Sequence, residues 1–257
     1  MKIEFIKRGA ATRLILIFAG WSTDARYYSD CTVEGCDTAV ISDYRDMEMP
    51  AIPEQYKTLY IFAYSLGVAA AAASRVPAAA RIGICGSLVP ASDRFGIPSS
   101  IYQGTLDGLN EKTLSRFHLR MAGDRKRYAE IIKSLPSSPD IEALKEELDY
   151  VRRLSQSELM DSDVRFDRVY IAEDDKIFPY KNLTSFWQQR DETTVVIKRG
   201  PHAVDLASII NECIPDAAGI GEGFQRAGIS YMEHALVQSE ICRRLAERLS
   251  ELLPSDK

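Results

Sequence analysis

Residues 58–74 constrain the fold of this 257-residue chain more than any other segment. An apolar run, TLYIFA, leads without a break into Tyr64-Ser65-Leu66-Gly67, and an alanine-rich segment, VAAAAAS, follows at once. The first run is typical of a buried strand, and the second is typical of a helix that packs closely on a sheet. A strand that turns directly into a helix is half of a βαβ unit, so the segment predicts an α/β fold.

Other apolar segments of strand length lie on both sides of this turn. The run LILIF at 14–18 has the character of a strand that is buried on both faces. Strands that alternate with helices predict a mostly parallel sheet flanked by helices. We expect the strands at residues 2–6, 13–18, 38–42, 58–63, 80–85, 167–172 and 194–198, with further helices near 181–190 and from Ala203.

The alternation stops at about 105–162, where the sequence is charged, helical in character and without a strand pattern. A helical insert between two halves of a parallel sheet is expected to form a small cap over an active site. After Pro215, four glycines mark a flexible stretch, and residues 229–252 have the pattern of an amphipathic helix. We therefore expect a compact α/β domain over 1–217, followed by a linker and an amphipathic helix over 218–257.

The composition excludes several classes of protein. The formal net charge of -5 argues against a general nucleic-acid binder. No run approaches the roughly 20 apolar residues of a membrane-spanning helix, and charges stand where a signal peptide has its apolar core, so we expect a cytoplasmic protein. The five cysteines are irregularly spaced, which favours reduced thiols over a disulfide framework or a metal site at Cys31 and Cys36. We expect neither a metal nor a cofactor.

The strand-to-helix turn is also the first chemical signal. The segment from Ala63 to Gly67 nearly fits Gly-x-Ser-x-Gly, a motif in which a sharp turn exposes a serine hydroxyl above the sheet. Ala63 replaces the first glycine and is still small enough for the bend. The start of the following helix favours the negative charge that develops when the serine attacks. We expect Ser65 to be a nucleophile; the alternative is an ordinary turn in which Ser65 caps the helix.

A serine nucleophile needs a histidine base that a carboxylate orients. His202 follows a predicted strand, in a loop of the kind where ligands bind in α/β sheets, whereas His118 and His234 are expected to be structural. The acid is expected between the serine and the histidine in the chain. Asp175 is our choice, because hydrolases of this type commonly have an aspartate followed by an apolar residue and proline. Asp174 is the alternative, and the acidic cluster can also be a solvated turn.

The attack on an ester creates a negative oxygen that backbone N–H groups have to bind. One donor is expected to be the N–H of Leu66, which directly follows the nucleophile. The other is expected from the loop after the strand at 13–18, at Gly20 and Trp21. The indole of Trp21 is placed to line an acyl pocket, although simple core packing is the alternative for this side chain.

Four segments together are similar to the motifs of one known family: Phe18-Ala19-Gly20-Trp21, Ala63-Tyr64-Ser65-Leu66-Gly67, Asp175-Lys176-Ile177-Phe178-Pro179 and Gly200-Pro201-His202. The chain resembles the BioG-type pimeloyl-acyl-carrier-protein methyl ester esterases, which have the α/β-hydrolase fold, over about residues 1–215. Where members of that family tend to have Asn-Gly-Thr, this chain has Cys85-Gly86-Ser87. That departure leaves the catalytic residues unchanged.

The segment after residue 217 is similar to a second family. Phe224-Gln225-Arg226-Ala227 and Tyr231 look like the opening of the BioC-type malonyl-acyl-carrier-protein O-methyltransferases. This resemblance implies a fusion of two enzymes that stops before any glycine-rich S-adenosylmethionine loop, so no methyltransferase activity is expected. The alternative for this segment is a plain amphipathic helix.

The first resemblance implies a substrate and a mechanism within biotin biosynthesis. The substrate would be a pimeloyl methyl ester thioesterified to an acyl-carrier protein. Ser65 would attack the methyl ester, His202 would protonate the departing methanol, and the thioester would remain intact. Three competing interpretations stay open on the residues alone: a thioesterase, a general short-chain carboxylesterase, and a non-catalytic binding module of the same fold. Nothing in the sequence indicates an oligomeric state.

The charged insert fits an acyl-carrier protein as the partner. Its basic residues outnumber Asp124 and Glu130 between positions 112 and 133, and an acidic carrier protein would be attracted to them. The alternative is a solvated helix face balanced by acidic residues at 142–149. Phe117 is a candidate for the acyl channel, with core packing as its alternative, and Arg116 and Arg120 are candidates for carrier contacts. The basic residues are Lys112, Arg116, Arg120, Arg125, Lys126, Arg127 and Lys133.

Overall fold

The computed structural model describes residues 1–159 and 162–214. The chain divides into two units, Met1–Pro215 and Asp216–Lys257, and the described fold belongs to the first. The amphipathic helix expected within 218–257, and His234 with it, lies outside the described residues. Among the described helices, none has the length and apolar character needed to cross a membrane.

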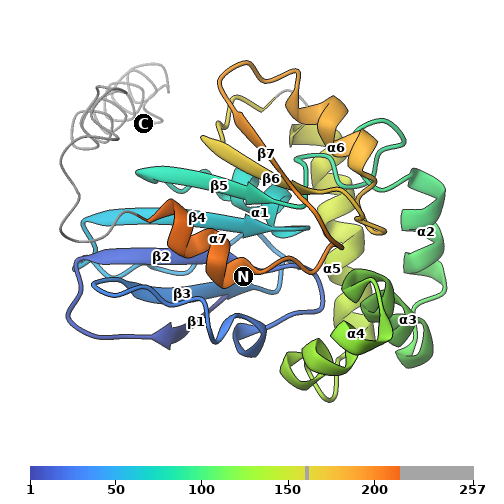
Figure 1. Cartoon of the computed structure of the whole chain (residues 1–257), viewed down its shortest axis with the longest axis horizontal. Helices are drawn as coiled ribbons and strands as arrows, with labels where there is room; N and C mark the ends of the chain where they lie inside the picture. The colour runs from blue at the N-terminus through green and yellow to red at the C-terminus, as the bar shows by residue number, and fades with distance from the viewer. Residues whose placement is uncertain (160–161, 215–257) are drawn as a thin grey trace, which may run out of the picture. The chain divides into compact units, whose positions relative to one another are not determined.

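A seven-stranded sheet forms the centre of the described fold (Figure 1). Its spatial order is β1-β3-β2-β4-β5-β6-β7, and every neighbouring pair is parallel except β1 with β3. The expected mostly parallel sheet is therefore confirmed. The strands are β1 (Lys2–Lys7), β2 (Arg13–Phe18), β3 (Asp37–Ser42), β4 (Thr58–Tyr64), β5 (Ala80–Ile84), β6 (Arg168–Ala172) and β7 (Thr194–Lys198).

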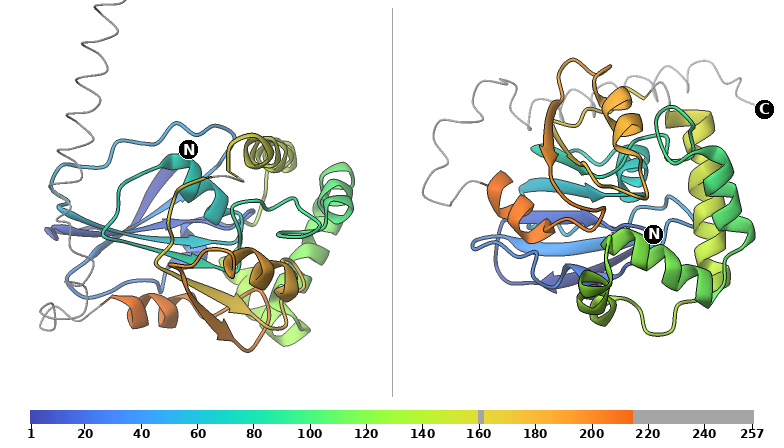
Figure 2. Two further views of the ribbon diagram at one scale, coloured as in Figure 1. Left: turned by 90° about the horizontal axis from the view of Figure 1, so that it is seen from above. Right: turned by 45° about the vertical axis from the view of Figure 1, so that its right-hand side comes forward.

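The central strands are apolar on both sides because helices cover both faces of the sheet. Alternate residues of β2 belong to two different core clusters. The first cluster includes α1 (Gly67–Ser74) and α6 (Tyr180–Trp187), and the second includes α7 (Leu206–Cys213). Figure 2 shows α1 and α7 on opposite sides of the sheet. The alanines at positions 69–72 of α1 are fully buried, which lets this helix lie close to the strands.

Two connections differ from the expected alternation. Between β2 and β3 there is only a short 3₁₀ turn, Ala25–Tyr28, and residues 43–57 connect β3 to β4 without a helix. The helix expected from Ala203 begins at Leu206, because the side chain of Asp205 accepts the N–H of Ser208 and caps the helix there.

The charged insert forms four helices beyond the carboxyl ends of the strands, at the right of Figure 1. Side-chain caps begin three of them: Asn110 for α3, Asp124 for α4 and Asp140 for α5. The first helix begins at Ser99, before the expected start of the insert at about 105. The helices are α2 (Ser99–Asp107), α3 (Glu111–Ala122), α4 (Arg125–Ile131) and α5 (Ile141–Leu154), followed by a π-helical turn at Ser155–Leu159.

A buried carboxyl group joins this cap to the segment that follows β3. Glu147 of α5 is only 7% exposed, and its Oε1 accepts the backbone N–H of Tyr44 at 3.1 Å. Burial raises the pKa of Glu147 from 4.5 to about 7, because the charged form loses its solvation. The negative charge of Asp43 adds to the shift in pKa.

Replacing Glu147 by glutamine is expected to stabilise the fold above pH 7 and to change it little near pH 4.5. The folded-state pKa is above the unfolded-state value, so the stability that Glu147 contributes at low pH is lost as the pH rises through about 7. The shift in pKa corresponds to about 3 kcal/mol. Thermal unfolding of E147Q at pH 5 and pH 8 measures the difference, with the exposed neighbour variant E146Q as control. An equal change in Tm at both pH values would contradict this account.

Candidate active site

The turn between β4 and α1 holds Ser65 in a strained conformation. Its φ of 57° lies in the left-handed region, which residues other than glycine rarely adopt. The backbone N–H of Ser65 donates to the carbonyl of Ile84 on β5 at 2.8 Å. A Cβ atom at Gly67 would come within 2.3 Å of the carbonyl oxygen of Phe18, so only glycine lets α1 start this close to β2. Ala63, in place of the motif's first glycine, is fully buried in the strand.

Ser65, His202 and Asp175 are joined by two hydrogen bonds. His202 Nε2 lies 2.9 Å from Ser65 Oγ, and His202 Nδ1 lies 2.7 Å from Asp175 Oδ2. The three side chains follow β4, β7 and β6 respectively, and all are buried. The arrangement fits a Ser-His-Asp triad. Asp174, the alternative acid, is exposed, and its backbone N–H donates to the carbonyl of Gly200.

Several contacts fix the carboxylate and the imidazole in place. Asp175 Oδ1 accepts the backbone N–H groups of Ile177 at 2.7 Å and Phe178 at 2.8 Å, which leaves Oδ2 for the histidine. The ring of Phe178 stacks on His202 with an interplanar angle of 9°. The Tyr64 hydroxyl donates to the carbonyl of His202 at 3.1 Å. The histidine ring is therefore held in one orientation, as a general base requires.

The buried thiol of Cys85 lies next to this pair. One ligand atom each from Cys85, Asp175 and His202 lies within 4.8 Å of the others, a spacing at which a metal ion could be held. Burial, and then the nearby Asp175, raise the pKa of the Cys85 thiol well above its ordinary value, so the thiol stays protonated. A protonated thiol is a poor ligand, and the histidine and the carboxylate already bond to each other. These residues fit a hydrogen-bonded triad and do not fit a metal centre.

The two expected oxyanion donors lie beside Ser65. Leu66 directly precedes α1, and Trp21 lies in the loop after β2, where its indole Nε1 donates to the carbonyl of Leu144 on α5 at 3.0 Å. Within residues 1–159 and 162–214, the backbone N–H groups of Leu66 and Trp21 donate to no protein acceptor. Both groups are therefore available to a bound substrate.

An apolar cavity of about 30 Å³ opens at the serine, between the sheet and the cap. Phe117 lines it and packs edge-to-face on Trp21, with ring centroids 4.9 Å apart. Arg116 and Arg120 do not line it; they are exposed on α3. Several of the other wall residues were not predicted from the sequence, although Ile177 and Phe178 stand only two and three positions after Asp175. The lining residues are Trp21, Ser65, Leu66, Ile97, Tyr102, Thr105, Phe117, Leu148, Ile177 and Phe178.

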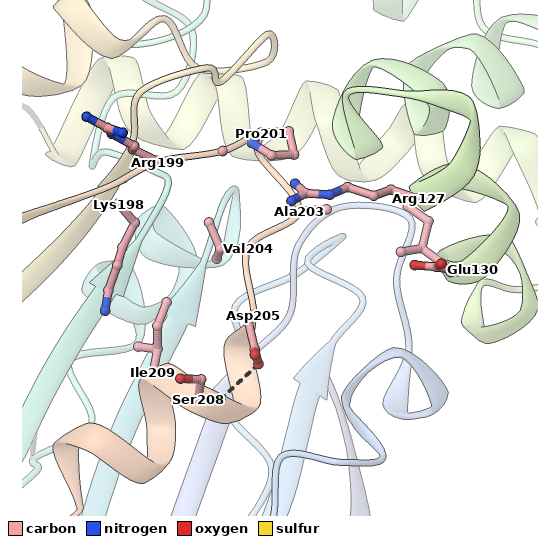
Figure 3. Close-up of a pocket in the computed structure, with 12 residues that line it drawn as sticks. Arg127, Glu130, Lys198, Arg199, Pro201, Ala203, Val204, Asp205, Ser208 and Ile209 are labelled. Atoms are coloured by element: carbon pink, nitrogen blue, oxygen red, sulfur yellow. Dashed lines mark hydrogen bonds between the residues drawn. The ribbon is translucent and has the colours of Figure 1, made fainter.

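A larger cavity of about 400 Å³ lies between α4 and the segment that joins β7 to α7 (Figure 3). Arg127 extends across it from α4 towards Pro201 and Ala203, while Asp205 turns away to bond Ser208. Ser65 does not line this cavity. The larger cavity borders the segment that carries His202, but Ser65 lines the smaller one.

Comparison with known proteins gives one family match over most of the chain. The family model described as pimeloyl-ACP methyl esterase BioG matches residues 1–204. A malonyl-[acyl-carrier protein] O-methyltransferase of Bacteroides fragilis is 33% identical over 250 residues, which cover 94% of this chain and 50% of that protein. This chain thus spans half the length of that relative. An uncharacterized protein of Haemophilus influenzae is 29% identical over 182 residues, covering 69% of this chain and 83% of that protein.

Solved structures share the fold. BioG from Haemophilus influenzae superposes with a TM-score of 0.73 at 26% identity, covering 79% of this chain and 94% of that one. A lipase-esterase related protein from Clostridium acetobutylicum superposes with a TM-score of 0.61 at 12% identity, covering 82% and 97%. At that low identity the second similarity shows the α/β-hydrolase fold alone.

Proposed function

This chain belongs to the BioG family of pimeloyl-ACP methyl esterases and is a carboxylic ester hydrolase, and from that premise we propose its substrate and its catalytic residues. The proposed substrate is a pimeloyl methyl ester carried by an acyl-carrier protein. The proposed triad is Ser65, His202 and Asp175. The proposal rests on the two hydrogen bonds that link Asp175 through His202 to Ser65, and on the apolar cavity that Ser65 lines.

The reaction divides into two half-reactions at Ser65. His202 Nε2 accepts the hydroxyl proton while Ser65 Oγ attacks the ester carbonyl, and Asp175 stabilises the imidazolium that forms. The N–H groups of Leu66 and Trp21 stabilise the tetrahedral oxyanion. When the C–O bond breaks, His202 gives its proton to the departing methanol. Water, deprotonated by His202, then attacks the acyl-enzyme. The bond between the acyl carbon and Ser65 Oγ breaks as His202 returns the proton to Oγ, and the free carboxylate leaves with the thioester intact.

Mass spectrometry of methyl-pimeloyl acyl-carrier protein, before and after incubation with this chain, tests the proposed substrate. The expected product is the carrier protein with the acyl chain still attached and one methyl group lost. Release of the whole acyl chain would mean thioesterase activity and would contradict the proposal. An unchanged carrier protein, alongside hydrolysis of a small methyl ester, would limit the conclusion to a general esterase.

The basic residues of the cap support an acidic partner. All seven belong to α3, α4 or the 3₁₀ turn Ile132–Ser134, and all are exposed. The acidic residues of α5 that were expected to balance them have other partners. Glu142 pairs with Lys145, Asp149 with Arg152 and Arg153, Glu146 with Arg45, and Glu147 with the backbone of Tyr44. Two of the basic residues, Arg116 and Arg120, share the helix of Phe117, which lines the cavity at Ser65.

Reversing the charge of both Arg116 and Arg120 to glutamate is expected to raise KM for the carrier-bound ester on the order of tenfold. Hydrolysis of a small, uncharged methyl ester is expected to stay unchanged, because neither arginine lines the cavity. Steady-state kinetics on both substrates measure the effect. The control is Lys57→Glu, at an exposed position just before β4, at the amino ends of the parallel strands and so away from the cap. A fall in activity on both substrates would argue against a docking role.

The segment 218–257 is proposed to be the start of a methyltransferase domain. The Bacteroides fragilis methyltransferase matches 94% of this chain, which is more than residues 1–217 contain. The three residues of the proposed triad all precede position 215, so the proposal for Ser65 is argued without that segment.

A further inference from the structure

A histidine of the cap reaches the loop that follows β2. His118 lies on α3 and is 5% exposed, and its Nε2 is 2.9 Å from the hydroxyl oxygen of Ser22. Burial lowers the pKa of His118 to about 4, so the ring is neutral at pH 7 and takes part as a hydrogen-bonding group. The triad does not use this histidine, and its position within a charged helix had suggested only a structural role.

Ser22 has a backbone conformation that contacts with its neighbours have to stabilise. Its φ of 62° lies in the left-handed region, where a residue with a Cβ atom is strained unless its surroundings hold it. The Ser22 side chain is 6% exposed and lies against α3. The hydrogen bond to His118 is therefore formed inside the protein, where it is stronger than in water and where an unpaired hydroxyl is costly.

Gly20, at the other end of the same loop, is held by two hydrogen bonds of its own. The Tyr28 hydroxyl accepts the backbone N–H of Gly20 at 2.7 Å, and the Thr23 hydroxyl donates to the carbonyl of Gly20 at 2.7 Å. Trp21, whose N–H is the proposed second oxyanion donor, lies between Gly20 and Ser22 in the chain. The buried Tyr28 holds Gly20 from the core of the α/β domain, and His118 holds Ser22 from the cap.

We propose that His118 is a positioning residue for ester hydrolysis, which acts through Ser22 to hold the Trp21 N–H beside that of Leu66. This inference rests on the proposed function, because it assigns a task within the same site. Adjacent residues of α3 then serve the reaction in two ways: Phe117 lines the cavity and His118 fixes the oxyanion loop. Loss of the His118 hydrogen bond weakens the binding of the transition state more than the binding of the ester itself.

The test compares His118→Leu, which removes the hydrogen bond, with His118→Gln, whose side-chain amide can restore it. On a small methyl ester, kcat of the leucine variant is expected to fall about 10- to 100-fold with KM within about twofold. The glutamine variant is expected to recover most of the loss. Phenylboronic acid, which forms a tetrahedral adduct with a nucleophilic serine, is expected to bind the leucine variant more weakly by a similar factor. E147Q serves as a cap control with unchanged kcat, and circular dichroism verifies that each variant is folded.

Ser22→Ala cuts the same hydrogen bond from the other side. If His118 acts through Ser22, the double variant is no slower than the slower single variant. Additive losses, a change confined to KM, or a folded leucine variant with full kcat would each overturn the inference while leaving the triad intact. A wild-type chain that hydrolyses no ester would remove the proposed function, and the inference with it.

Discussion

Replacing Ser65 by alanine is expected to lower kcat for methyl ester hydrolysis on the order of 10⁵-fold, to the level that bound water alone can reach. The variant loses the atom that forms the acyl-enzyme, so His202 has no hydroxyl to deprotonate. The residual rate comes from the oxyanion donors and from substrate binding. Initial rates on a small methyl ester and on the carrier-bound ester measure the loss.

Ser87→Ala is the matched control for this variant. Ser87 is also a buried serine beyond the end of a central strand, and its hydroxyl has no hydrogen-bond partner among the described residues. Its removal is expected to leave kcat unchanged. A fluorophosphonate, which reacts with activated serines, is expected to label the wild type and the Ser87 variant at Ser65 and to leave the Ser65 variant unlabelled. Persistent hydrolysis by the folded Ser65 variant would show that the nucleophile is another residue.

Replacing Asp175 by asparagine is expected to lower kcat on the order of 10³- to 10⁴-fold. Asparagine keeps an oxygen for the N–H groups of Ile177 and Phe178, so the loop is expected to keep its shape. Its amide presents a donor to His202 Nδ1 in place of an acceptor. The histidine then carries its proton on Nε2, which faces Ser65, and is no longer available as a base.

The variant Asp174→Asn tests whether Asp174 or Asp175 is the carboxylate that orients His202. Asp174 is exposed and makes its hydrogen bond through the backbone, so kcat of this variant is expected to match that of the wild type. Thermal unfolding of both variants checks that each one folds. If Asp174→Asn were the slower enzyme, the orienting carboxylate would have been assigned to the wrong residue.

The parts of the fold that repeat a local pattern were predictable from the sequence. Each parallel strand is a short apolar run, because both of its faces are covered, and the chain order of serine, acid and histidine follows from where the strands end. The pairing of β1 with β3 was not predictable, because residues 2–6 and 13–18 are consecutive strands with a polar turn between them. In the structure β3 lies between them, and no local signal specifies that neighbour.

The helical character of the cap was predicted from the sequence, but the start of its first helix and its contact with Ser22 were not. The start of α2 at Ser99 was missed because SSIYQGTLD contains a glycine and little helical periodicity. Tertiary contacts hold this helix instead: Tyr102 is buried, and its hydroxyl donates to the carbonyl of Leu148 on α5. The contact between Ser22 and His118 joins residues 96 positions apart, and a lone histidine in a charged helix gives no sign of such a partner.

The order of the proposed catalytic residues along the chain has a consequence for folding. The helices of the cap lie between Ser65 and Asp175, and the hydrogen bond from Ser65 to His202 spans 137 positions. Contacts of such long range are slow to form, because a long loop has to close before they contribute any stability. A nascent chain that has left the ribosome only as far as the cap therefore contains Ser65 but not His202. With the proposed triad, hydrolysis begins only when β7 has joined the sheet, so the onset of activity would mark the assembly of the complete sheet and not an early stage of its folding.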